Sequence, residues 1–347
     1  MKALILAGGK GTRLRPLTVY TPKPIVPVIN RPFLLFQIEI LRRAGITDIV
    51  LSLNYQPNKI QHLLGDGSEY GVDLSYVTEP NPMGTGGAYK YAVGDSEEPT
   101  IVLNGDILTD LVVKDLVESH YASKADATIC LKRVEDPSAY GAVDSDESGK
   151  VTAFREKPKP EDIDESDVNL INAGIYVLEP KVLDLIEEDT NTSFEYDVFP
   201  KILENGMHFG SFKLDDAYWC DIGTPNKYLS AHSDFLAGKI RRFHLGKRPE
   251  SIEIATRATI DEQSVFGENC VIKPGAVIEN SVIGEGVHIE ERAEVKNSVI
   301  WPHSRISNSA KVQDSIVAKG CYVGQNVTVS AGSVLGDKTS LTDYTIV

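Results

Sequence analysis

Up to about residue 237, short apolar runs alternate with segments of helical periodicity. The first apolar run covers residues 1–7 and predicts a buried strand, and similar runs occupy residues 48–54, 73–79 and 100–106. Between these runs, the apolar spacing predicts a largely buried helix over 33–41 that ends at Ala44-Gly45, and shorter helices over 86–93 and 113–121. This alternation is typical of an α/β domain with a mainly parallel, Rossmann-like sheet.

Strands dominate the next stretch, residues 127–221, with helical segments expected near 182–188 and 196–204. We interpret this stretch as an acceptor-binding part of the same domain. Thr224-Pro225 opens a final helix, and the basic segment 238–249 is polar enough to be a solvated linker. The predicted domains are therefore 1–237, a linker over 238–250, and 251–347.

The last part of the chain repeats with a period of 17 residues between 262 and 329. Aliphatic positions recur at spacings of five, six and six, which places one inward side chain on each short strand and three strands on each turn. The quartets NSVI, NSVI and DSIV at 280–283, 297–300 and 314–317 recur once per turn. The pattern predicts a triangular, left-handed parallel β-helix of the hexapeptide type. The three inward columns are Phe266, Ile283, Ile300 and Val317; Ile272, Ile289, Ile306 and Val323; and Ile278, Val295, Val312 and Val329.

Charge and cysteine content narrow the possible partners. The 347 residues include 35 Lys and Arg against 50 Asp and Glu, a net charge of -15, which argues against a nucleic-acid partner. The four cysteines form no C-x-x-C pair, so we expect reduced, buried thiols rather than a zinc site or disulfides. Because no apolar run approaches the roughly 18 residues of a membrane span, and the N-terminal apolar run is short, we expect a cytoplasmic protein without a membrane partner.

The first strand runs into a glycine-rich loop, Leu6-Ala7-Gly8-Gly9-Lys10-Gly11-Thr12-Arg13. Glycines after a strand can bring backbone N–H groups against phosphates. The spacing fits neither a P-loop nor the dinucleotide G-x-G-x-x-G pattern. Arg13 lies within the loop, and Lys23 is flanked by Pro22 and Pro24, which stiffen the backbone around a cation. The loop is therefore a candidate phosphate site of a different kind.

These residues resemble the sugar-1-phosphate nucleotidyltransferases, and most closely the members that make GDP-mannose from GTP and mannose 1-phosphate. The resemblance covers nearly the whole chain. It rests on the GGKGTRLRPLT and PKP segments, GTGG at 84–87, LNGD at 103–106, YG at 140–141, EKP at 156–158, NAGIY at 172–176, WCDIGT at 219–224 and the β-helix.

The resemblance implies a reaction and the residues that carry it. A sugar 1-phosphate oxygen would attack the α-phosphate of a nucleoside triphosphate in line, and magnesium pyrophosphate would leave. The implied catalytic residues are Arg13, Lys23, Asp106, Lys157 and Asp221, with Asp106 and Asp221 as ligands of Mg²⁺. The implied nucleotide site comprises Leu6, Ala7, Gly8, Gly9, Gly11, Thr12, Arg13, Lys23, Glu79, Gly84 and Asp106. The implied sugar-phosphate site comprises Gly141, Glu156, Lys157, Asn172 and Gly174.

Glu79 bears on the choice of base. By resemblance this position faces the base edge, where thymidylyl and uridylyl members carry Gln. Guanine presents two adjacent donors, N1–H and the exocyclic amine, which one carboxylate can accept together and an amide cannot. Glu79 therefore favours guanine, although a solvated Glu before Pro80 is the structural alternative.

Other functions remain open at this stage. The sugar could be glucose or a heptose instead of mannose, so a glucose-1-phosphate thymidylyl- or uridylyltransferase and a heptose-1-phosphate guanylyltransferase are alternatives. A non-catalytic regulatory subunit is disfavoured because the charged residues are all present. A β-helix acyltransferase would need His288 or His303 as a base, yet neither lies in a recognisable motif. We expect the β-helix to support a homo-oligomer or regulation instead.

Overall fold

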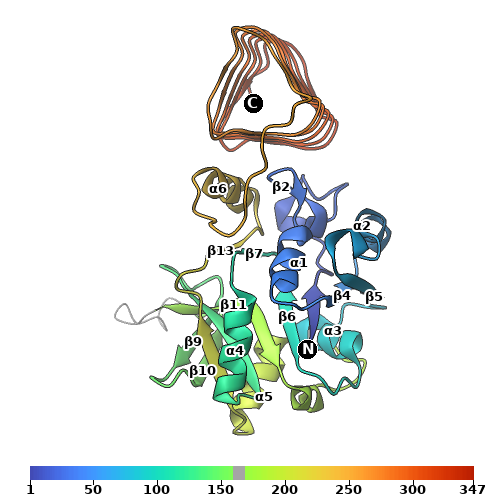
Figure 1. Cartoon of the computed structure of the whole chain (residues 1–347), viewed down its shortest axis with the longest axis vertical. Helices are drawn as coiled ribbons and strands as arrows, with labels where there is room; N and C mark the ends of the chain where they lie inside the picture. Colours follow the sequence, from blue (N-terminus) through green and yellow to red (C-terminus); the bar gives the residue numbers. More distant parts are fainter. Residues whose placement is uncertain (159–168) are drawn as a thin grey trace. The chain divides into compact units, whose positions relative to one another are not determined.

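The computed structural model describes residues 1–158 and 169–347, which divide into two compact units. The first unit consists of residues 1–9 and 34–219, and the second of residues 10–33 and 220–347. Much of the glycine-rich start of the chain, including Arg13 and Lys23, therefore belongs to the same unit as the C-terminal part (Figure 1).

The first unit is built on one mixed sheet with the strand order β10-β9-β11-β6-β1-β4-β5 and with β8 and β12 attached through β11. Strand β1 pairs in parallel with β4 and β6, and β4 pairs in parallel with β5, whereas β11 is antiparallel to β6 and β8. The expected mainly parallel, Rossmann-like half is confirmed. The strands are β1 (Lys2–Leu6), β4 (Asp48–Leu53), β5 (Asp73–Thr78), β6 (Thr100–Asn104), β7 (Ile107–Thr109), β8 (Ala127–Arg133), β9 (Gly141–Ser145), β10 (Val151–Glu156), β11 (Leu170–Leu178) and β12 (Phe209–Lys213).

Helices connect these strands and contribute much of the core. Tyr89, Tyr176, Phe194, Phe199 and Phe209 form a buried aromatic cluster with ring centroids 5.2–5.7 Å apart. The helices are α1 (Leu34–Arg43), α2 (Pro57–Leu64), η3 (Ser68–Tyr70), α3 (Gly84–Val93), α4 (Val113–Ser123), η5 (Pro180–Leu185), η6 (Phe194–Val198) and α5 (Phe199–Glu204).

Two helical segments differ from the sequence expectation. Helix α2 was not predicted because only Ile60 and Leu64 of its side chains are buried, which leaves too weak an apolar period. The segment expected near 182–188 is a 3₁₀ helix that starts earlier, with Pro180 at its first position.

The second unit begins with a short compact segment. It contains the 3₁₀ helices η1 (Thr12–Leu14) and η2 (Lys23–Ile25) and the two-stranded ribbon of β2 (Pro27–Val28) and β3 (Arg31–Pro32). After β13 (Trp219–Asp221), which spans the boundary between the units, helix α6 (Pro225–Leu236) starts at Thr224, whose hydroxyl accepts from a backbone N–H of the first turn. The expected linker has no regular structure, but Ile240 and Phe243 within it are buried, so it is anchored and not simply solvated.

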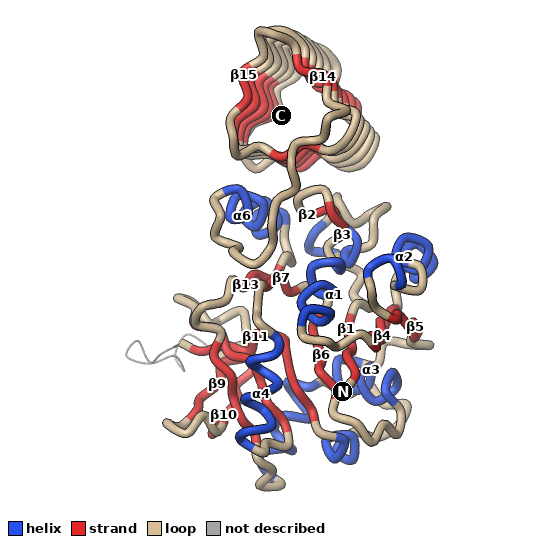
Figure 2. The backbone as a smooth tube through the Cα atoms, in the orientation of Figure 1, coloured by secondary structure: helices blue, strands red, loops and turns tan. Residues whose placement is uncertain are grey.

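The rest of the unit is a parallel β-helix, seen end-on as a triangular coil in Figure 1 and with its strands in red in Figure 2. Three sheets of parallel strands confirm the predicted architecture. The sheets are β14 (Glu253–Ile254), β17 (Val271–Ile272), β20 (His288–Ile289), β23 (Arg305–Ile306), β26 (Tyr322–Val323) and β29 (Ser340–Leu341); β15 (Thr259–Ile260), β18 (Val277–Glu279), β21 (Glu294–Lys296), β24 (Lys311–Gln313) and β27 (Thr328–Val329); and β16 (Val265–Phe266), β19 (Val282–Ile283), β22 (Val299–Ile300), β25 (Ile316–Val317) and β28 (Val334–Leu335).

The three predicted aliphatic columns line the interior of the β-helix. Neighbouring coils align them one above another, as Ile272 with Ile289 and Ile306. The period is 17 residues in the middle, whereas Ile254 pairs with Ile272 and Val323 pairs with Leu341, a step of 18 at either end. The end coils therefore accommodate one extra residue without changing the register of the interior.

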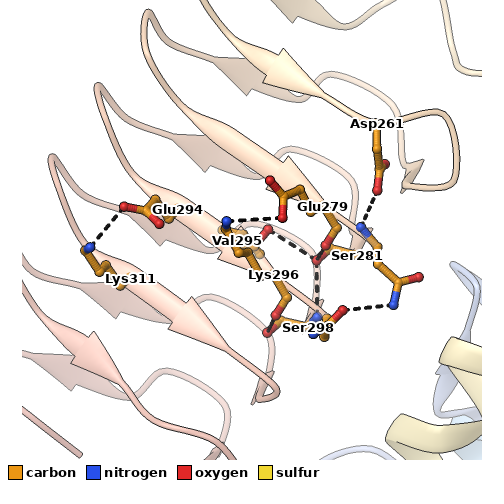
Figure 3. A network of polar contacts seen from close by, with 10 residues as sticks. Asp261, Glu279, Ser281, Glu294, Val295, Lys296, Ser298 and Lys311 are labelled. Carbon is orange, nitrogen blue, oxygen red and sulfur yellow. Dashed lines mark hydrogen bonds and ion pairs between the residues drawn. The ribbon is translucent and has the colours of Figure 1, made fainter.

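Polar ladders reinforce the turns between coils. The Ser281 hydroxyl donates to the Glu279 carbonyl and accepts from the Ser298 N–H at 3.1 Å, and the next coil repeats the arrangement with Ser298 and the N–H of Ser315 (Figure 3). Ion pairs such as Lys296 with Glu279 cross between coils on the outer surface. The serine of each of the first two quartets thus satisfies a buried backbone N–H of the next coil.

Ile289→Ala should lower the free energy of unfolding by about 2–5 kcal/mol, because it leaves a cavity in a fully buried column of the β-helix. Urea denaturation of the full chain measures the effect through the transition midpoint. His288→Ala is the matched control, since His288 is the exposed neighbour on the same two-residue strand. Equal midpoints for the two variants would contradict the inward assignment of Ile289.

Candidate functional site

In the first unit, the ends of β1 and β6 meet where the strand order reverses. The Gly105 N–H donates to the Leu6 carbonyl at 2.9 Å, and a Cβ at Gly105 would lie 2.6 Å from that oxygen. Only glycine therefore allows this approach. It brings Gly105 against Leu6 and Ala7, and the half-buried Asp106 follows at this carboxyl edge of the sheet, the edge at which open α/β sheets bind ligands.

Glu79 lies against the same loop. A Cβ at Gly8 would lie 2.9 Å from Glu79 Oε1, so the bare backbone of Gly8 leaves room for this carboxylate. Oε1 accepts from the Ser52 hydroxyl at 3.0 Å, and Oε2 accepts from the Met83 N–H at 3.3 Å. The carboxylate is oriented by two donors and is not simply solvated, unlike the structural alternative considered for this residue.

The GTGG segment packs against residues 190–195. Gly84 has φ +71°, and a Cβ there would lie 2.5 Å from the Thr192 carbonyl oxygen. The Thr85 hydroxyl donates to Glu195 Oε2 at 3.0 Å and accepts from the Phe194 N–H at 2.8 Å. The loop that follows Glu79 is therefore tied to the segment that carries Glu195.

Two of the predicted sugar residues face each other across a pair of antiparallel strands. Glu156 on β10 is opposite Gly141 on β9, and a Cβ at Gly141 would lie 2.9 Å from Glu156 Oε2. Lys157 follows with φ +46°, its N–H donates to the Tyr140 carbonyl, and its Nζ lies 3.3 Å from Glu156 Oε1. The structure brings Gly141, Glu156 and Lys157 together.

The other two predicted sugar residues lie on an irregular part of β11. The pairing of β11 with β8 shifts register between Asn172 and Tyr176. Asn172 Oδ1 accepts from the Gly174 N–H at 2.9 Å, and Gly174, with φ +72°, packs against the Asn104 side chain. Trp219 Nε1 donates to the Ala173 carbonyl at 2.8 Å, which fixes this bulge beside the end of β6.

Glu156 occupies an environment that disfavours its charge. Burial raises the pKa of the Glu156 carboxyl above its ordinary value, the nearby Lys157 ammonium opposes this rise, and the Glu195 carboxylate adds to it. The side chain of Glu156 is 13% exposed, whereas that of Lys157 is 60% exposed. The Lys157 ammonium is therefore accessible to a ligand that approaches from solvent, whereas the Glu156 carboxylate is largely buried.

In the second unit, the glycine-rich segment folds around Lys23. Gly11 has φ +63°, its carbonyl accepts from the Thr18 hydroxyl at 2.7 Å, and a Cβ there would lie 3.0 Å from the Lys23 Cβ. Lys23 is only 8% exposed, although it is a cation. Thr12 and Arg13, in the short helix η1, are exposed.

Asp221 and Arg13 come together at the start of α6. A Cβ at Gly223 would lie 3.3 Å from Arg13 Nη2 and 3.5 Å from Asp221 Oδ2. Lys227 in the first turn of α6 forms an ion pair with Asp221 Oδ1. The second unit therefore places two cations, Arg13 and Lys227, beside Asp221, one of the two predicted metal ligands.

The predicted metal ligands supply carboxylate oxygens, the donors that Mg²⁺ prefers. Among the described residues, no cluster of three or more His, Cys, Asp or Glu side chains could hold a metal ion. A site of one or two carboxylates completed by phosphate oxygens and water is the usual form for Mg²⁺, and this chain's donors fit that form. Asp106 belongs to the first unit and Asp221 to the second, so their joint action stays a prediction.

Sequence reasoning missed several residues of these clusters. Lys227 stands in the first turn of a predicted helix, where its pairing with Asp221 leaves no signal in the spacing. Ser52, the second-last residue of β4, lies within a strand that was predicted, but nothing in the sequence marked its hydroxyl as a partner of Glu79. Glu195 carries no sequence signal, because its contact with Thr85 spans 110 residues.

The expectation for the cysteines is partly corrected. All four are free thiols, and three are buried, but Cys220, which precedes Asp221, is only half-buried. None of the helices in the described part of the chain combines the length and apolarity that a membrane span requires.

Two family profiles match the chain. The family described as Nucleotidyl transferase matches residues 2–238, and the EIF2B subunit epsilon LbH domain, where LbH denotes a left-handed β-helix, matches residues 247–347. The mannose-1-phosphate guanylyltransferase of Mycobacterium tuberculosis is 37% identical over 280 residues, which cover 79% of this chain and 77% of that protein. The mannose-1-phosphate guanyltransferase of Pichia angusta is 41% identical over 284 residues, 80% of this chain and 73% of that protein.

A solved structure is also similar. The crystal structure of HddC from Yersinia pseudotuberculosis matches with a TM-score of 0.58 and 34% sequence identity, over 67% of this chain and 99% of HddC. This chain and HddC therefore have the same fold over that 67% of this chain.

Glu156→Gln should change how stability depends on pH. Because the folded state raises the carboxyl pKa, it binds the proton more tightly than the unfolded state, and the parent loses stability as pH rises from the unfolded pKa through the folded one. The free energy of unfolding of the variant minus that of the parent should therefore be larger at about pH 7 than at about pH 4. Urea titrations at each pH measure this difference.

Glu147→Gln, which removes a carboxylate at an exposed position of the same unit, is the matched control for the loss of one charge. A difference for Glu156→Gln that does not vary with pH would refute the raised pKa.

Proposed function

This chain belongs to the nucleotidyl transferase family, and we propose that it transfers a guanylyl group from GTP to mannose 1-phosphate, forming GDP-mannose and pyrophosphate. The names of its relatives in Mycobacterium tuberculosis and Pichia angusta support this choice of substrates. The family resemblance and the enzyme class expected from the sequence are confirmed.

We propose that the first unit binds the base and the sugar phosphate. Asn172, the Gly174 backbone and Glu156 would bind sugar hydroxyls, since each offers hydrogen-bonding groups at one end of the sheet. The exposed ammonium of Lys157 would hold the 1-phosphate and orient its oxygen for in-line attack. Gly141 would leave room for the sugar beside the Glu156 carboxylate, because a side chain at this position would occupy that space.

The second unit would bind the triphosphate. Phosphoryl transfer requires neutralisation of charge on the phosphate oxygens, and Arg13 and Lys23 would supply it at the leaving pyrophosphate. Members of the family generally use a divalent metal, and we propose Mg²⁺ held by Asp106 and Asp221. When bound, the ion would neutralise charge on the phosphate oxygens. Lys227 would keep the Asp221 carboxylate oriented.

The observation that carries the choice of guanine is the environment of Glu79. Each carboxylate oxygen has two lone pairs, and Ser52 and Met83 occupy one on each oxygen. One acceptor site therefore remains on each oxygen, which matches the two adjacent donors of guanine. A glutamine here could offer only one accepting oxygen.

The remaining expectations from the sequence are part of the same proposal. We propose the domains 1–237 and 251–347 with a linker over 238–250, and the spans of the two family profiles, 2–238 and 247–347, support this division. We propose a cytoplasmic homo-oligomer in which the β-helix contributes contacts, because Tyr344 and Ile346 at its last coil are 74% and 76% exposed. The net charge of -15 supports small-molecule substrates rather than nucleic acid.

The function is tested by pyrophosphate release with Mg²⁺ across GTP, dTTP, UTP, CTP and ATP, each against mannose 1-phosphate and glucose 1-phosphate. We expect release with GTP and mannose 1-phosphate, abolished by EDTA and restored by Mg²⁺. Release confined to dTTP or UTP with glucose 1-phosphate would keep the reaction and overturn the substrates. No release with any pair, together with binding of GDP-mannose, would favour the regulatory subunit.

Glu79→Gln should lower kcat/KM for GTP by about 10- to 100-fold, because loss of a charge-assisted hydrogen bond costs about 1.5–3 kcal/mol. The same assay should show a smaller loss, or none, for UTP. Glu97→Gln is the control, since Glu97 is exposed and precedes the opposite end of β6. An unchanged ratio of GTP to UTP turnover would remove Glu79 from base recognition.

A further inference from the structure

One outer face of the β-helix is apolar and covered. In the sheet of β16, β19, β22, β25 and β28, the second residue of each strand points inward, so the first points outward. These outward residues, Val282, Val299 and Ile316, are at most 3% exposed. In the sheet that contains β20 and β23, by contrast, the first residues of these two strands, His288 and Arg305, point outward and are exposed. The third residue of each repeated quartet therefore points out of the β-helix and is covered by another part of the chain.

Part of that partner is α6, which belongs to the same unit. Leu229, His232 and Leu236 of α6 and Val282 and Val299 of the β-helix line one small cavity. His232 is buried, its Nδ1 lies 2.8 Å from the Tyr228 carbonyl, and burial lowers its pKa to about 4, so it is neutral in this setting. The helix that follows Asp221 thus rests on the apolar face.

A relay of hydrogen bonds extends from the β-helix to the segment that carries Arg13 and Lys23. Trp301 Nε1, directly after β22, donates to the Tyr228 hydroxyl at 2.9 Å, and that hydroxyl donates to the Pro27 carbonyl. Trp301 is 2% exposed and Tyr228 is fully buried. The buried indole N–H of Trp301 and the buried hydroxyl of Tyr228 each find their hydrogen-bond acceptor within this relay.

Two further contacts hold the same segment. Asn30 Nδ2 donates to the Ile283 carbonyl of the β-helix at 2.9 Å. A Cβ at Gly336, in the last turns of the β-helix, would lie 3.2 Å from the Pro16 Cβ. The segment is therefore held on both sides of Lys23, at Pro16 before it and at Pro27 and Asn30 after it. The first of these contacts lies three residues after Arg13.

We propose that Trp301 and Tyr228 are positioning residues, through which the β-helix fixes the Arg13–Asn30 segment and the start of α6 for phosphate binding. The β-helix is then part of the catalytic apparatus of this chain and not an appended module. The inference rests on the proposed roles of Arg13, Lys23 and Asp221. It follows from the hydrogen-bond relay of Trp301, Tyr228 and Pro27. Pro27 lies in the segment that carries Arg13 and Lys23, and Tyr228 lies in α6, the helix that follows Asp221.

The test is Trp301→Phe in the full chain, which keeps an aromatic ring but removes the N–H donor. We expect amide hydrogen exchange within residues 10–33 to accelerate about tenfold, since a broken hydrogen bond shifts a local equilibrium by about that factor. We also expect kcat to fall about tenfold while the KM for mannose 1-phosphate is unchanged, because the proposed sugar residues belong to the other unit.

Tyr322→Phe is the control, because Tyr322 is an exposed aromatic on another sheet of the β-helix. Asn30→Asp, which removes the donor to Ile283 at nearly the same shape, should act in the same direction and keeps the test valid if Trp301→Phe does not fold. Asp also tolerates the φ of +60° at this position.

Exchange in residues 10–33 that matches the parent, or that rises equally across the chain, overturns the inference even when the enzyme is active. A parent that releases no pyrophosphate with any pair overturns the proposed function, while the exchange measurement still decides whether the relay fixes the segment. Accelerated exchange with unchanged kcat overturns the catalytic part of the inference.

Discussion

The close approach of β1 and β6 is the constraint on which the candidate site of the first unit depends. Parallel pairing aligns Leu6 with Asn104, and the missing side chain of Gly105 lets the chain after β6 touch the Leu6 carbonyl. Asp106 consequently follows the end of β6 close to the end of β1, and Glu79 reaches Gly8 from the end of β5. A bulkier residue at Gly8 or Gly105 would push apart groups that we propose bind one nucleotide.

The two units divide the candidate chemistry by charge. The first unit presents carboxylates, amides and one exposed lysine, which suit hydroxyl groups, base edges and a single phosphate. The second unit places Arg13 and Lys227 beside Asp221 and holds Lys23 against Gly11, a set of cations that suits the proposed triphosphate. A chain with a net charge of -15 thus still presents cations at the proposed site of a polyanion, and the surrounding negative charge does not preclude this.

The faces of the β-helix have different partners. Ion pairs such as Lys296 with Glu279 and Lys311 with Glu294 cross between coils on one face, where water screens them and each contributes little. The face of Val282 and Val299 instead buries aliphatic side chains against α6, and the buried Trp301–Tyr228 relay makes that docking specific. Burial of these aliphatic side chains stabilises the packing of α6 on the β-helix, and the hydrogen bonds of the relay fix the orientation of α6.

The sequence by itself determined the alternation of strands and helices, the 17-residue coil and most of the candidate residues, because apolar periodicity and glycine spacing are local properties. It also indicated Glu79 and the carboxylates, since each stands at a predicted strand end. Only the tertiary structure decided that Glu195 meets Thr85, that Lys227 pairs with Asp221, and that the outward Val282 and Val299 pack against α6. Glu195 and Thr85 are 110 residues apart, the pairing of Asp221 with Lys227 joins a strand end to a helix start, and no periodicity records which partner will cover an outward face.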